Sequence, residues 1–196
     1  MSAQPQPYPA WGQPLLGGSR HTADDVERMP DDGFRYEVYR GVLIRMPGTG
    51  GSHGAICQFI GRFIDDYWRG LGERYRVRQN MGFDFSFTGD PAQSTMLVPD
   101  VAVTADNSFP DPGIGQTPPL IAIEVASPSD YRPQMAMKAS FYLNSGVKEV
   151  WVVWPKTRTM DVWTAPNAST TYSDQQSITS ILLPGFSCAI SHFFEG

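Results

Sequence analysis

Two short apolar segments that each carry one carboxylate constrain the fold most strongly. Residues 97–103 contain Asp100, and residues 120–126 contain Glu124. Their length and composition predict buried strands rather than helices. An ionised carboxylate in such a strand is costly unless a cation or several hydrogen-bond donors offset its lost hydration. The connection is short enough for these strands to be neighbours in one sheet, so the pair indicates a metal site.

The rest of the chain predicts helices and strands in mixed order. Apolar residues recur at three- and four-residue steps over residues 52–71, which predicts a long helix with Ser52 as its cap. The other expected elements are a short helix capped by Thr22, a hairpin over 34–46 turning at Arg40-Gly41, a strand over 75–88, a helix from Pro133 to Gly146, and strands over 149–154, 160–164 and 178–183. We therefore expect an α/β (α+β) fold with a mixed sheet flanked by helices.

The 196-residue chain is long enough for one domain with a substantial core. We expect a disordered or loosely docked extension over the proline-rich residues 1–20 and a single domain over 21–196. Hydrophobic residues make up 41% and charged residues 18%, which excludes a highly charged disordered chain. The composition is that of an ordinary globular protein.

Charge and cysteine content narrow the class of partner and the compartment. The net charge of −5 counts against tight nonspecific binding of nucleic acid by the whole molecule. Four arginines nevertheless fall within ten residues, at Arg69, Arg74, Arg76 and Arg78. The two isolated cysteines form no CxxC pair and have no third or fourth partner in the sequence that would complete a zinc site, and no segment approaches the roughly 20 apolar residues of a membrane span. Without a signal-peptide pattern at the start, we expect a cytoplasmic protein with no membrane partner.

The two carboxylates suit a hard divalent cation. Asp100 and Glu124 at one end of a sheet can hold Mg²⁺, and the backbone carbonyl of Val125 could complete its inner shell. Such an ion can activate water and polarise a phosphoryl group, and hydrolysis also benefits from a lysine near the attacking water. The chain has three lysines, and Lys148 and Lys156 lie where solvated lysines are expected. Lys138 alone shares a helix face with apolar residues, so its ammonium should point toward the sheet.

These residues carry a resemblance to a known family. Pro99-Asp100, Glu124-Val125 and a following lysine resemble the PD-(D/E)xK motif of restriction-endonuclease-like nucleases. From about residue 22 to 194 the chain more specifically resembles the Uma-type restriction endonuclease family. The motifs that carry this resemblance are Arg35-Tyr36-Glu37 with Gly41, Pro99 to Val103, Glu124 to Ser129, Lys138, Tyr142, Gly146 to Trp151 and Leu183 to Phe186.

The resemblance implies a restriction-endonuclease-like fold, dependence on Mg²⁺ or Mn²⁺, hydrolysis of phosphodiester bonds and a homodimer. Ala126 occupies the position where the nuclease motif usually has its lysine, and the Uma-type pattern instead places the lysine on the following helix, at Lys138. Glu37 matches the family's early glutamate and becomes a possible third acid. The expected substrate is nucleic acid, with DNA favoured over RNA.

Other interpretations stay open at this point. Asp100 after Pro99 can simply satisfy a turn, and Glu124 can form a buried salt bridge with Lys138 or an arginine. The chain would then be a non-catalytic nucleic-acid or protein-binding member of the same fold. Processing of a smaller phosphate ester is a third possibility. His53, at the start of the long helix, is expected to face solvent more often than to contact a phosphate or a water.

Overall fold

The computed structural model describes residues 12–15, 18–48, 50–70, 75–105 and 113–194. A six-stranded mixed sheet has the order β11-β10-β9-β8-β7-β4. The neighbouring strands β7 (Val101–Ala105) and β8 (Ile121–Val125) are antiparallel, and β8 runs parallel to β9 (Glu149–Trp154). The other members are β4 (Tyr75–Gln79), β10 (Thr159–Ala165) and β11 (Ala168–Ser173). The expected pairing of the Asp100 and Glu124 segments is confirmed.

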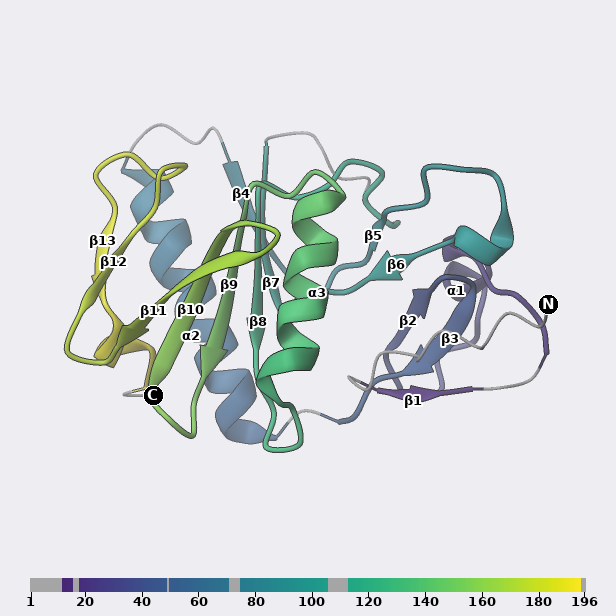
Figure 1. Ribbon diagram of the computed structural model, residues 1–196, viewed down its shortest axis with the longest axis horizontal. Coiled ribbons are helices and arrows are strands. Elements are labelled where there is room, and N and C mark those ends of the chain that lie inside the picture. The colour runs from purple at the N-terminus through teal and green to yellow at the C-terminus, as the bar shows by residue number, and fades with distance from the viewer. Residues whose placement is uncertain (1–11, 16–17, 49, 71–74, 106–112, 195–196) are drawn as a thin grey trace.

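One long helix covers each face of this sheet (Figure 1). Helix α2 (Gly51–Arg69) packs Ile60 and Ile64 against Ile121, Ile123 and other alternate residues of the strands. Helix α3 (Arg132–Asn144) packs Met135, Ala139 and Tyr142 against the opposite face. Because side chains alternate along a strand, Glu124 belongs to the face that α3 covers.

A second sheet, formed mainly by the N-terminal part of the chain, packs beside α3 (Figure 1). Its order is β1-β3-β2-β6-β5. The strands are β1 (Gln13–Pro14), β2 (Tyr36–Tyr39), β3 (Val42–Arg45), β5 (Phe83–Asp84) and β6 (Met96–Leu97). The predicted hairpin is β2–β3, and its turn residues Arg40 and Gly41 both have positive φ, at 49° and 75°. This hairpin carries Glu37.

The remaining elements are short. They are α1 (Ala23–Glu27), two 3-10 turns, η1 (Pro91–Gln93) and η2 (Ile190–Phe194), and the paired strands β12 (Ser177–Thr179) and β13 (Ser187–Ala189). Thr22 caps α1 as expected, in a reciprocal capping box with Asp25. Of the extension predicted over residues 1–20, residues 1–11 and 16–17 lie outside the described residues, as does Arg74 of the arginine group. Within the described ranges, no helix is both long and apolar enough to cross a membrane.

Several local features differ from the predictions, including the strand expected over 178–183, which ends at Thr179. The residue that caps α2 is Gly50, not Ser52. The expected strand over 75–88 is two strands in different sheets, because Asn80 has a φ of 53° and turns the chain between them. Asp100 lies directly before β7 instead of inside a strand. The edge strand β11 was not predicted, because its sequence is polar and largely exposed.

Candidate active site

A buried ion-pair network connects the N-terminal sheet, α3 and the central sheet. Nζ of Lys138 lies 3.0 Å from Oε1 of Glu37 and 2.9 Å from Oε1 of Glu124. The lysine is 1% exposed, Glu37 is 0% exposed and Glu124 is 6% exposed. Charges at this depth are tolerated when each is paired and hydrogen-bonded. Burial lowers the pKa of Lys138, but the attraction of Glu124 and Glu37 outweighs burial, so the net shift is upward and the lysine stays protonated.

Two more donors contact this network, while Oε2 of Glu37 has no hydrogen-bond partner among the described residues. The hydroxyl of Tyr142, one turn beyond Lys138 on α3, donates to Oε1 of Glu124 at 2.7 Å. The backbone amide of Val98 donates to Oε1 of Glu37 at 2.8 Å. Burial raises the pKa of Glu124 to about 7, partly offset by Lys138. Burial, followed by the charge of Glu124, also raises the pKa of Tyr142, so the phenol stays a donor.

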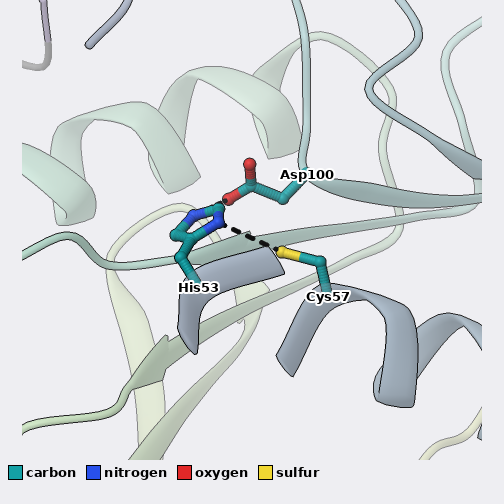
Figure 2. Close-up of side chains that lie close together, drawn as sticks. All are labelled: His53, Cys57 and Asp100. Atoms are coloured by element: carbon teal, nitrogen blue, oxygen red, sulfur yellow. Dashed lines mark hydrogen bonds and ion pairs between the residues drawn. The ribbon is translucent and has the colours of Figure 1, made fainter. Parts of the chain in front are cut away.

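Asp100 lies at the N-terminal end of β7, where its carboxylate meets the end of β8. Oδ2 accepts a hydrogen bond from the backbone amide of Val125 at 2.9 Å and lies 3.2 Å from Nε2 of His53 (Figure 2). The guanidinium of Arg35 is 3.7 Å from Oδ1. Burial raises the pKa of Asp100, but the hydrogen bond from His53 and that histidine's charge outweigh it, and the net shift is downward. The hydrogen bond with Asp100 in turn raises the pKa of His53.

Asp100 and Glu124 both face one cavity of about 660 Å³. Arg35, His53, Asp100, Glu124 and Lys138 contribute to its wall. Glu37 lies behind Lys138, outside the cavity lining that the described residues form. The rest of the wall includes Val125, Ala126, Ser127, Tyr131, Arg132, Trp154 and Lys156. A cavity of this size, with converging polar groups, has the properties of a ligand site.

The donors at this cavity fit a hard divalent cation. Asp100 and Glu124 offer carboxylate oxygens, the ligand type that Mg²⁺ and Mn²⁺ prefer, and neither residue is more than 6% exposed. One oxygen of each is already oriented by protein donors, as ligand carboxylates usually are. The backbone of Val125 also lies at this point, because its amide donates to Oδ2 of Asp100 and the residue lines the cavity. The residues predicted to bind metal therefore line one cavity.

A model of the Uma2 family, described as "Putative restriction endonuclease", matches residues 23–191. The chain belongs to the Uma2 family. Its fold is similar to that of a protein from Anabaena variabilis described as a putative nuclease belonging to the DUF820 family, with a TM-score of 0.74 and 20% identity. The match covers 89% of this chain and 97% of that one. This similarity confirms the restriction-endonuclease-like fold. No curated protein matches the chain.

In this Uma2 protein the four predicted site residues lie together. Lys138, selected from three lysines by its helix face, reaches both Glu37 and Glu124, while Lys148 and Lys156 are exposed. The solvent-facing position expected for His53 is wrong, because its side chain is only 14% exposed and contacts Asp100. In the sequence, a site on this face of α2 was indicated only by the four-residue spacing of His53 and Cys57, which places them one helical turn apart. It could not indicate Asp100 as the third residue.

Proposed function

We propose that this Uma2 protein is a divalent-metal-dependent endonuclease that hydrolyses phosphodiester bonds of nucleic acid. The observation that carries this proposal is the placement of Asp100 and Glu124 on the wall of one cavity, with Lys138 buried beside them. The family match and the nuclease neighbour support the same reaction class. Fold similarity alone would not assign an activity, so the weight lies on the site.

Asp100 and Glu124 would hold Mg²⁺ or Mn²⁺, with the carbonyl of Val125 as a further oxygen donor. When bound, the ion supplies Lewis-acid polarisation of a phosphoryl oxygen and lowers the pKa of a coordinated water. Lys138 and Tyr142 keep Glu124 in one orientation, through contacts of 2.9 Å and 2.7 Å to the same oxygen. Glu37 fixes Lys138 from behind.

The charge state of Lys138 narrows its role. Its pKa is raised by Glu124 and Glu37 against the effect of burial, so it does not accept a proton from water at neutral pH. It serves as a fixed cation that holds Glu124 and offsets negative charge near a scissile phosphate. Lys138, on the buried face of α3, can thus take the role of the motif lysine, whose usual position is occupied by Ala126 in this chain.

The rim of the cavity supports a nucleic-acid substrate. Arg35, Arg132 and Lys156 bring positive charge to a molecule whose net charge is −5, and Tyr131, 52% exposed, offers an aromatic ring. Cations that contact phosphates and rings that stack on bases are the usual parts of such surfaces. We propose DNA in preference to RNA. The homodimer and the cytoplasmic location stay predictions.

The test is cleavage of single- and double-stranded DNA and RNA by the purified protein in Mg²⁺ or Mn²⁺. Wild type should cleave at least one substrate, and Asp100→Ala and Glu124→Gln should each lower the rate by about 100-fold or more. Glu149→Gln is the matched control, because Glu149 is also a buried strand glutamate but does not line the cavity. The proposal fails if wild type cleaves no substrate faster than Asp100→Ala does.

A second candidate is a non-catalytic binding protein with a structural ion pair. It is favoured by the occupation of Oε1 of Glu124, which already contacts both Lys138 and Tyr142. Calorimetric titration with Mn²⁺ separates the two functions. A catalytic site predicts a Mn²⁺-binding step that Glu124→Gln removes, whereas a structural pair predicts no such step.

A further inference from the structure

Asp100 is shared by two groups of side chains. On the side of α3 it lines the cavity with Glu124. On the side of α2 it meets His53 and Cys57, which are four residues apart on that helix and project to the same side (Figure 2). Neither the nuclease motif nor the proposed mechanism uses Cys57. We name His53, Cys57 and Asp100 the α2 triad.

The atoms of the α2 triad are close enough to share one ion. Sγ of Cys57 lies 3.5 Å from Nδ1 of His53, and Nε2 of His53 lies 3.2 Å from Oδ2 of Asp100. One ligand atom from each residue lies within 4.8 Å of the other two. Bonds of about 2.0–2.3 Å to a tetrahedral ion place ligand atoms roughly 3.5 Å apart. Because Nδ1 of His53 faces Cys57 and Nε2 faces Asp100, the imidazole must turn to aim one nitrogen at the shared point.

The donor set selects a class of metal. A sulfur, an imidazole nitrogen and a carboxylate oxygen form a typical ligand set for Zn²⁺ or Co²⁺, whereas Mg²⁺ prefers oxygen donors alone. Cys57 is 5% exposed and Asp100 is 6% exposed, so the ion would be largely shielded from solvent. His53 and Asp100 line the cavity, which gives a route of entry and room for a water as fourth ligand.

We propose that the α2 triad binds a borderline transition metal such as Zn²⁺, and that this ion withdraws Asp100 from the Mg²⁺ site. The first part stands on the geometry of the triad alone, and the second rests on the proposed function. Ligation by Cys57 releases the thiol proton to the buffer, because the thiolate is the ligand form. Zn²⁺ is then an inhibitor that competes for Asp100 instead of serving the nuclease reaction.

Co²⁺ is the probe for the first part, because a thiolate bound to Co²⁺ gives a near-ultraviolet charge-transfer band that oxygen and nitrogen ligands do not give. The folded wild type should show this band at one equivalent of Co²⁺, and Cys57→Ala should lose it. Cys188→Ala is the matched control, since Cys188 is the other buried cysteine and lies on β13. A wild type without the band, or a band that persists in Cys57→Ala, overturns the proposal.

His53→Ala provides a second variant, with folding of each variant checked by circular dichroism. It should weaken Zn²⁺ binding, measured by calorimetry, by at least about tenfold, the loss that even outer-shell partners of a metal produce. His192→Ala, on η2, should leave Zn²⁺ binding unchanged. Equal Zn²⁺ affinity in His53→Ala and wild type contradicts the triad even if Cys57→Ala fails to fold.

Glu124→Gln separates this proposal from the proposed function. It should keep the Co²⁺ band, because Glu124 is outside the triad, while losing cleavage in Mg²⁺. A wild type that shows the band but never cleaves nucleic acid would overturn the nuclease and leave the triad standing. If the nuclease is active, Zn²⁺ added in the presence of Mg²⁺ should inhibit cleavage by wild type and inhibit cleavage by Cys57→Ala much less. Equal inhibition of the two proteins would contradict the proposal that Zn²⁺ competes for Asp100.

Discussion

The two sides of the central sheet hold their buried charges in different ways. On the α3 side, Lys138 contacts two glutamates within 3.0 Å, and Tyr142 adds a fourth member. On the α2 side, His53 meets Asp100 at 3.2 Å, and its own side chain retains 14% exposure. The first arrangement is a closed network in which each charge depends on the others. The second is an open contact whose partners can exchange.

This difference separates the roles of the two sides. A network in which a fully buried lysine joins two glutamates keeps those residues in one arrangement and leaves little freedom for exchange. The His53–Asp100 contact lies at the cavity wall, where another cation can more easily take the place of His53 beside Asp100. We therefore infer that the α3 side orients the site and that the α2 side is where its ligation can change.

The largest effect is expected for Lys138→Met. Removing the cation leaves Glu37 and Glu124 buried without their partner, and breaking a buried ion pair in this way costs about 3–5 kcal/mol of unfolding free energy. Urea denaturation measures the loss. Lys148→Met is the control, because Lys148 is exposed, and it should change stability by less than about 0.5 kcal/mol. Similar losses for both lysines would show that the network is not closed.

Tyr142→Phe should have an intermediate effect. It removes one hydrogen bond to the carboxylate of Glu124 but leaves Lys138 in place, so the expected loss of unfolding free energy is about 1.5–3 kcal/mol. Tyr131→Phe, at an exposed position, is the control. Because Lys138 and Tyr142 contact the same oxygen, the double variant should be less unstable than the sum of the two single variants. Additive losses would contradict a shared network.

His53→Gln tests the open side. Glutamine keeps a polar group near Asp100 but removes the charge, so we expect a loss of about 1 kcal/mol or less in urea denaturation. His192→Gln provides the matched control for an imidazole lost elsewhere. A loss as large as that of Lys138→Met would remove the contrast between the two sides.

The sequence predicted the α3 side better than the α2 side for a physical reason. Helical periodicity places Lys138 beside Met135 and Tyr142, and a lysine on a buried helix face must find an acid. Glu124 was predicted directly, because it is the lone carboxylate in an apolar strand segment. Glu37 entered only through the family resemblance, since its partner Lys138 is 101 residues away and no local pattern connects them.

The α2 side depends on contacts that leave no periodic signal. His53 is polar and begins a helix, so its local sequence is that of an exposed residue, and its burial follows from Asp100 arriving from another element. The split of residues 75–88 into β4 and β5 was missed for a related reason. The alternating phenylalanines Phe83, Phe85 and Phe87 all follow Asn80, and their alternation gives no sign of the turn at that residue.

Glu149 allows the smallest and most specific test. It is a buried strand glutamate that accepts a hydrogen bond from the hydroxyl of Ser180, and no cation contacts it among the described residues. Burial raises its pKa above the ordinary value of 4.5, partly offset by that hydrogen bond. The folded state therefore binds the proton more tightly than the unfolded state. The resulting stabilisation is fully present below pH 4.5 and is lost as pH rises through the folded-state pKa. Urea denaturation across this range should show a shallower decline in Glu149→Gln than in wild type. Identical slopes would mean that burial without a cation leaves Glu149 unperturbed, and the need of Glu124 for Lys138 would then require another explanation.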